Sequence, residues 1–184
     1  MTDLAVLWHA EHANLARLLD LLEKQVAAFH AGEQPNYDLM QDLVYYLRHY
    51  PDQVHHPQEN VAFARLLERD PQMKPRIARL VQDHRVIAAA GQTLLEHLDA
   101  VVADALAPRS TVEAAAAAYL AHYRAHLAAE EQEVIPRAAE LLTAQDWADV
   151  AAAVPAQTDP LFGDDIEARY RKLRRQIALE AMPS

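Results

Sequence analysis

The chain contains no cysteine among its 184 residues and only three glycines. The lack of cysteine excludes disulfides, thiolate nucleophiles, iron–sulfur clusters and Cys-ligated zinc. The scarcity of glycine, beside many alanine, leucine, glutamate and arginine residues, argues against an all-β fold, which needs many turns and β-branched strands. The composition therefore predicts an all-α protein.

Positive charge is also scarce, with 17 Lys and Arg residues against 27 Asp and Glu residues and a net charge of −10. This balance argues against a nucleic-acid partner, because binding a phosphate backbone requires a basic surface. The longest apolar run, residues 114–121, is too short to span a membrane. The N-terminus has acids and histidines where a signal peptide would be basic and then apolar. We therefore expect a cytoplasmic protein with no membrane partner.

Apolar residues make up 52% of the chain and recur at spacings of three and four residues, which is typical of amphipathic helices. Short corners between four long helices favour an antiparallel up-down four-helix bundle with additional C-terminal helices. We expect a single domain, with the bundle over residues 1–154 and a loop and helical extension over 155–184. The predicted long helices cover about residues 3–31, 37–70 and 75–106, and the fourth begins at a cap formed by Ser110 or Thr111 and ends at about residue 142. A last charged helix covers 165–181.

The ten histidines follow a pattern that indicates a metal site. A histidine and a glutamate four residues apart lie one turn apart on the same face of a helix, where both can reach one metal site. This spacing occurs once in the second predicted helix and once in the fourth, and the first and third helices each have one histidine on the inward stripe. The six candidate metal ligands are therefore His12, His55, Glu59, His84, His126 and Glu130.

Four imidazoles and two carboxylates suit two transition-metal ions, iron or manganese, rather than structural zinc or an all-oxygen calcium or magnesium cage. Burial of these groups without metal would cost several kcal/mol each, by the order of magnitude known for desolvated polar and charged groups. No histidine has a glutamate three residues before it, so the ferritin-like type of di-iron enzyme is excluded.

These motifs resemble the hemerythrin-like, or HHE cation-binding, family over about residues 4–142. The resemblance implies a four-helix bundle around a non-haem di-iron site with an oxo or hydroxo bridge, and O₂, NO or peroxide as the small ligand. It also implies that the two glutamates bridge the metals, that His12 and His55 bind one iron, and that His84 and His126 bind the other. The matching segments are Glu11-His12, His55-His56-Pro57-Gln58-Glu59, Asp83-His84, His126-Leu127-Ala128-Ala129-Glu130-Glu131 and Pro136.

One position departs from the oxygen-carrying members of that family, which have a fifth histidine one turn after the ligand of the third helix. This chain has Ala88 there, so reversible O₂ carriage is disfavoured. On an uninterrupted helix His56 points about 100° away from His55, but a kink at Pro57 would let the two exchange roles. The candidate replacement ligands or outer neighbours are His9, His56, Tyr119, His122 and Tyr123.

The sequence leaves three functions open. The first is a di-iron protein that binds or senses O₂, NO or redox state or handles iron, and the second is a di-iron enzyme with oxidase or peroxidase-like activity. The third is a metal-free helical interaction module. A C-terminal basic cluster is either a solvated face that pairs with the acidic body or a contact in a homodimer. It consists of Arg169, Arg171, Lys172, Arg174 and Arg175.

Overall fold

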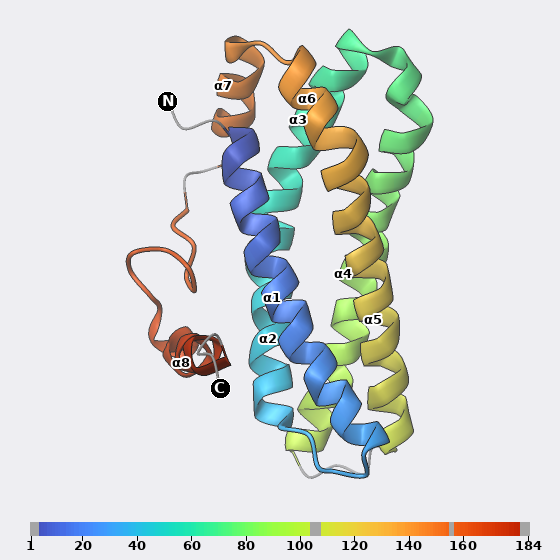
Figure 1. The fold of residues 1–184 in the computed structure, drawn as a ribbon, viewed down its shortest axis with the longest axis vertical. Coiled ribbons are helices and arrows are strands. Elements are labelled where there is room, and N and C mark those ends of the chain that lie inside the picture. Colours follow the sequence, from blue (N-terminus) through green and yellow to red (C-terminus); the bar gives the residue numbers. More distant parts are fainter. Residues whose placement is uncertain (1–3, 104–107, 155–156, 181–184) are drawn as a thin grey trace.

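The computed structural model describes residues 4–103, 108–154 and 157–180, and these residues form helices and no strands. The prediction of an all-α protein is therefore confirmed. Four long helical segments lie alongside one another, and two shorter helices flank them (Figure 1). The long segments are α1 (Leu4–His30); α2 (Tyr37–Tyr50) with η1 (Pro51–His55) and α3 (His56–Arg69); α4 (Lys74–Val102); and α5 (Arg109–Ala129) with η3 (Glu130–Val134) and α6 (Ile135–Leu141).

Short corners reverse the chain between these segments. At the end of α1, Gly32 adopts a φ of +75°, which a residue with a side chain rarely tolerates, and the last carbonyls of the helix are bonded by the next amides. Asn36 then caps α2 by accepting a hydrogen bond of 3.0 Å from the Leu39 amide. Asp70 accepts a hydrogen bond from the Gln72 amide at the corner that holds η2 (Pro71–Met73). The predicted helix ends at residues 106 and 181 lie outside the described residues.

Two of the long segments contain a π-turn, and each π-turn adjoins one of the two His/Glu pairs. In η1 the amide of His56 bonds the carbonyl of Pro51, and in η3 the amide of Ile135 bonds the carbonyl of Glu130. A proline, Pro57 or Pro136, stands two residues after each π-turn. Because proline has no amide proton, it interrupts the α-helical hydrogen-bond ladder at that point. The sequence predicted the first interruption but not the second.

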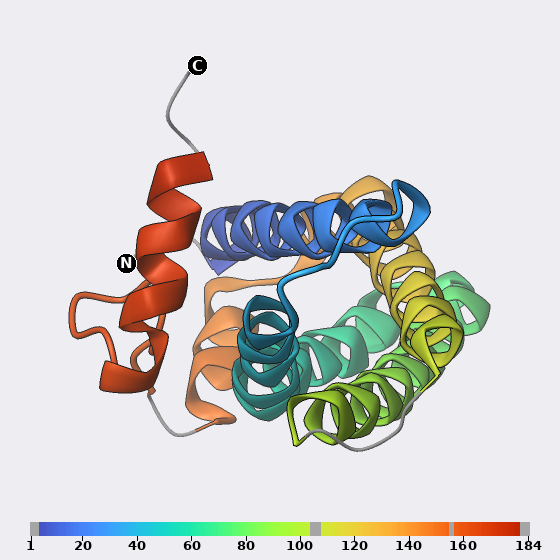
Figure 2. The same ribbon diagram turned by 90° about the horizontal axis from the view of Figure 1, so that it is seen from below.

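The buried side chains form two apolar clusters separated by a polar layer. One cluster contains Leu15 of α1 and residues such as Leu47 of α2, whereas the other contains Trp8 of α1 and Leu66 of α3. Seen end-on, the long segments surround a common axis (Figure 2). The polar layer between the clusters consists of the seven buried side chains His12, His55, His56, Glu59, His84, His126 and Glu130.

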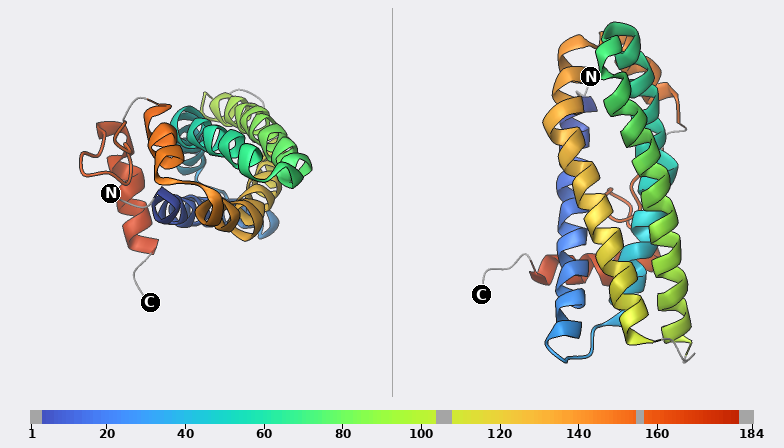
Figure 3. Two further views of the ribbon diagram at one scale, coloured as in Figure 1. Left: turned by 90° about the horizontal axis from the view of Figure 1, so that it is seen from above. Right: turned by 90° about the vertical axis from the view of Figure 1, so that its right-hand side faces the viewer.

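The C-terminal part packs on the outside of the long segments. Helix α7 (Ala144–Ala152) begins with a capping box between Thr143 and Asp146. Residues 157–180, which include η4 (Ala168–Tyr170) and α8 (Arg171–Glu180), lie beside α1 and α2 (Figure 3). The hydroxyl of Tyr46 donates a hydrogen bond of 2.9 Å to Asp159 and so ties this part to α2.

The predicted basic cluster makes contacts within the chain. The ammonium of Lys172 lies 3.8 Å from the Asp38 carboxylate, and Arg174 donates a hydrogen bond to the backbone carbonyl of Leu161. Arg169 lies over the ring of Tyr45. Among the described helices, none is both long and apolar enough to cross a membrane.

Candidate metal centre

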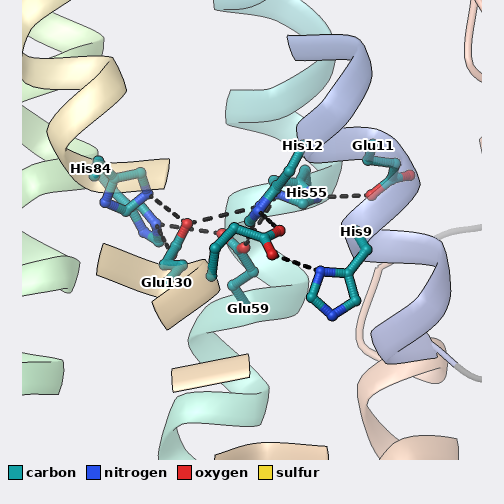
Figure 4. Close-up of polar contacts among 9 residues, drawn as sticks. His9, Glu11, His12, His55, Glu59, His84 and Glu130 are labelled. Atoms are coloured by element: carbon teal, nitrogen blue, oxygen red, sulfur yellow. Dashed lines mark hydrogen bonds and ion pairs between the residues drawn. The ribbon is translucent and has the colours of Figure 1, made fainter. Parts of the chain in front are cut away.

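The structure brings the six predicted ligands together from all four long segments. His12 comes from α1, His84 from α4 and His126 from α5, and each lies on the inner face of its helix. His55 and Glu59 come from the junction of η1 with α3, and Glu130 opens η3. Figure 4 shows the labelled side chains meeting between the ribbons. His84 is the most exposed of the six at 7%, so water has little access to any of them.

Glu59 lies between two groups of histidines. Its Oε1 atom is 3.1 Å from Nε2 of His55 and 3.3 Å from Nε2 of His12. Its Oε2 atom is 3.4 Å from Nε2 of His84. One oxygen therefore faces each group, which is the arrangement that a carboxylate needs to bridge two metal ions. Consistently, Glu59 belongs to both sets of side chains that could hold an ion: His12, His55 and Glu59, and His56, Glu59, His84 and His126.

Glu130 reaches the same space from the opposite side. Its Oε2 atom is 3.2 Å from Nε2 of His126 and 3.7 Å from Nε2 of His12. Its Oε1 atom is 3.6 Å from Nε2 of His84. The two carboxylates and the ring nitrogens thus enclose one small polar space, with the acids between the imidazoles.

Most of these converging atoms have no hydrogen-bond partner among the described residues. Both oxygens of Glu59 and of Glu130, and both ring nitrogens of His84 and of His126, are buried and unbonded. Buried polar groups are rarely left in this state, because each one loses its hydration without compensation. Nitrogen and carboxylate lone pairs that face a common space are the donors that a transition metal requires, so the residues present fit a metal site.

Burial and mutual contacts perturb the pKa values of the site. Burial lowers the pKa of His126 to about 2 and raises that of Glu130 to about 7. Burial would also lower the pKa of His84, but contacts with Glu130 and Glu59 outweigh it and raise this pKa to about 9. Burial opposes ionisation of Glu59, yet His55 and His12 hold its pKa well below the usual value. Without metal, therefore, the site retains protons at neutral pH.

Two of the histidines contact carboxylates outside the cluster through Nδ1, the ring nitrogen that faces away from the site. Nδ1 of His55 lies 2.8 Å from Glu11, and Nδ1 of His12 lies 2.7 Å from Glu131. Each contact favours the tautomer with its proton on Nδ1 and leaves the Nε2 lone pair directed into the site. Glu131 also contacts the half-exposed His9 at 2.5 Å, so His9 stands at the edge of the site. Sequence reasoning assigned no role to either glutamate, although each stands beside a predicted ligand in the chain.

His56 lies inside the cluster together with His55, at a point where the helix is interrupted. Both are buried, at 4% and 2% exposure. The physical reason is the π-turn Pro51–His55, which adds a residue to the turn and rotates the helix that follows. His56 therefore does not exchange roles with His55 but accompanies it.

The other candidate neighbours take different places. Tyr119 and Tyr123 are fully buried, and the ring of Tyr123 lies 6.2 Å from that of His56. Neither hydroxyl has a hydrogen-bond partner among the described residues. His122 is exposed and does not reach the site, because it lies on the outer face of α5. Ala88, one turn after His84, is partly buried and offers no ligand atom.

Aromatic rings border the site on the side of the apolar cluster that contains Trp8 and Leu66. The ring of Trp8 lies 6.2 Å from that of His55, and Phe63 stacks on His84 at 6.0 Å. On the opposite side, a small cavity lined by Glu11, Tyr50 and other residues extends from His55 towards Asp159 of the C-terminal part. The surroundings are thus largely apolar, with one small cavity beside His55.

Comparison with known proteins agrees with this geometry. The family model described as the hemerythrin HHE cation binding domain matches residues 3–138, which is most of the chain. A search of curated proteins and a search of solved structures each gave no significant match. The buried His/Glu cluster lies within the matched region, as expected for a cation-binding domain. The chain belongs to the hemerythrin HHE cation-binding domain family.

Proposed function

We propose that this protein binds two iron ions in the polar layer of an antiparallel up-down four-helix bundle and uses them to bind or sense O₂, NO or a related oxidant. The observation that carries the proposal is the set of buried, unbonded ligand atoms on His84, His126, Glu59 and Glu130. Bound iron would supply an open coordination position and reversible one-electron chemistry. Family membership supports a cation as the natural occupant.

The ligand set supports two metal positions rather than one. His12 and His55 face one oxygen of Glu59, and His84 faces the other. We assign His12 and His55 to the first metal and His84 and His126 to the second, with Glu59 and Glu130 as bridges. A mixed nitrogen and oxygen set suits iron and also admits manganese.

Burial of the site supports a very small external ligand. The ligand side chains are almost fully buried, and the cavity beside His55 is narrow. The cavity beside His55 has a volume of about 10 Å³, close to the space that one water needs, so such surroundings suit a very small molecule rather than a larger organic substrate. We therefore favour O₂, NO or peroxide, and a binding or sensing role over turnover of a bulky substrate.

The decisive experiment is elemental analysis of the purified protein with an electronic spectrum of the same aerobic sample. Two irons per chain and a near-ultraviolet band from oxygen-bridged iron are expected. His84→Ala and Glu59→Ala should each lower bound iron well below two per chain, whereas His97→Ala should not, because that histidine lies outside the cluster. Equal iron in all three variants, or a protein that stays metal-free after anaerobic Fe²⁺ loading, would refute the proposal.

Steady-state consumption of peroxide separates the sensing role from the enzymatic alternative. A sensor or carrier reacts once per metal centre, so consumption stops after a stoichiometric amount. Continued consumption that depends on Glu59 and His84 would instead establish a peroxidase-like enzyme.

A further inference from the structure

We propose that His56 is a third imidazole ligand on the His84–His126 side of the metal centre, and that Asp52, held by Arg48, is its positioning residue. This inference rests on the proposed metal-binding function and adds a ligand to the six assigned above.

The first support is the state of the His56 ring. It is 4% exposed, and its Nε2 atom has no hydrogen-bond partner among the described residues. A ligand atom of His56 lies within 4.8 Å of ligand atoms of Glu59, His84 and His126. The ring stacks on His84, with centroids 4.2 Å apart and an angle of 14° between the planes. The His56 ring thus belongs to the same small space as the other donors, and it has an unbonded nitrogen.

The second support is the carboxylate behind the ring. Nδ1 of His56 lies 3.2 Å from Oδ1 of Asp52, one helical turn earlier. A carboxylate at this position favours a proton on Nδ1 and leaves the lone pair on Nε2, as in carboxylate–histidine–metal arrangements. His55 and His12 also have a carboxylate beside Nδ1, in hydrogen bonds with Glu11 and Glu131, whereas Asp52 is within ion-pair distance of His56. His12 and His55 present Nε2 to Glu59 in the centre, and we infer the same orientation for His56.

The third support is the way in which the fold holds Asp52. Its other oxygen, Oδ2, pairs with the guanidinium of Arg48, which also donates a hydrogen bond of 3.2 Å to Gln92 of α4. The stem of Arg48 passes over Gly91, where a Cβ atom would lie 2.5 Å from its Cδ atom and 2.9 Å from the ring of Tyr119. The missing side chain at Gly91 therefore leaves room for Arg48 to reach Asp52.

His49 is a control for His56, because it lies in the same long segment but makes different contacts. It lies one residue beyond Arg48, but its Nδ1 atom bonds the backbone carbonyl of Tyr45 at 2.7 Å and its ring stacks on the Tyr45 ring. It belongs to neither set of side chains that could hold an ion among the described residues. His49 is thus a histidine that serves local packing, and it is the control for His56.

The test is ¹H NMR of the Co²⁺-loaded protein, in which the ring N–H proton of each metal-bound histidine gives an exchangeable signal far outside the normal range. Five such signals are expected, one each from His12, His55, His56, His84 and His126. His56→Gln should remove one signal and keep the other four, and His49→Gln should keep all five. Asp52→Asn should keep five signals, move one of them, and weaken Co²⁺ binding by about 10–100-fold, the usual cost of losing an outer partner.

Four signals in the wild type, or an unchanged spectrum in His56→Gln, would overturn this inference while leaving the metal centre intact. A wild-type protein that binds no metal would instead overturn the proposed function itself. Circular dichroism of each metal-free variant establishes that it folds. If His56→Gln does not fold, the number of signals in the wild type together with the shifted signal in Asp52→Asn decides the question.

Discussion

Glu59→Gln tests the proposed bridging role of this carboxylate at nearly constant side-chain volume. Glu59 is 1% exposed and contacts histidines of both groups, His12 and His55 through one oxygen and His84 through the other. Its removal should weaken the binding of both metals at once. Loss of a residue that contacts a metal ligand but not the metal costs about 10–100-fold in metal affinity. Loss of a bridging ligand should therefore cost at least about 100-fold.

This loss of affinity translates into a loss of stability in the presence of metal. At free Fe²⁺ of about 1,000 times the wild-type Kd, binding at one metal site stabilises the folded state by about 4.1 kcal/mol. A 100-fold weaker site retains about 1.4 kcal/mol at the same concentration, which is a difference of about 2.7 kcal/mol for each site. For a chain of this size, about 2–4 °C of Tm correspond to each kcal/mol. The metal-induced rise in Tm should therefore shrink by roughly 5–11 °C for each site that is weakened.

The assay is anaerobic thermal unfolding of the wild type and the variant, each with and without Fe²⁺. Glu68→Gln is the matched control, because Glu68 lies on the same helix α3 but its side chain is 61% exposed and faces Arg65. The control should keep the full metal-induced rise in Tm. If Glu59→Gln also kept it, Glu59 would not be a metal ligand and the two-metal assignment would fail.

Three further predictions concern protons, packing and a helix cap. The raised pKa of His84, about 9, and of Glu130, about 7, means that metal binding must displace protons, so metal affinity should rise from pH 6 to 9. For the metal-free protein, the stability due to His84 is fully present below its unfolded pKa of about 6.5 and is lost as the pH rises through about 9. Metal titration at several pH values tests the rise in affinity, and urea unfolding at several pH values tests the loss of stability. A flat pH profile in either assay would contradict the corresponding prediction. Trp8→Ala should cost about 3–5 kcal/mol of unfolding free energy, because Trp8 is 1% exposed and packs on His55 and Trp147; a loss below about 1 kcal/mol in urea unfolding would refute this packing role. Thr143→Ala should cost about 1 kcal/mol through loss of the α7 cap and leave the metal content unchanged; reduced metal content would show that α7 supports the site.

Much of the candidate site follows from spacing along single helices. A histidine and a glutamate four residues apart must share a helical face, whatever surrounds the helix. For the same reason the apolar stripes placed His12 beside Trp8 and Leu15, and all three are buried. The role of these residues as metal ligands stays a prediction until metal is measured.

The π-turns were harder to predict because the sequence indicates each of them by a single proline. Pro57 indicated a disturbance near His55, and the structure has a π-turn there. Pro136 likewise stands two residues after η3, but the apolar pattern around Glu130 is that of one continuous helix, so the second π-turn was not predicted. A single missing amide changes the rotation of a helix without changing its apolar pattern, so the pattern alone does not detect it.

The sequence by itself determined that the protein is helical, which face of each long helix is buried, and which histidines and glutamates share those faces, because these properties depend on local geometry and hydrophobicity. Only the tertiary structure decided that His56 joins the cluster and that Glu11, Glu131 and Asp52 stand behind the histidines. Those contacts depend on how each helix is rotated about its axis and packed against its neighbours. The π-turns change that rotation, and the packing includes the close approach of Arg48 and Tyr119 to Gly91, residues that lie far apart in the chain.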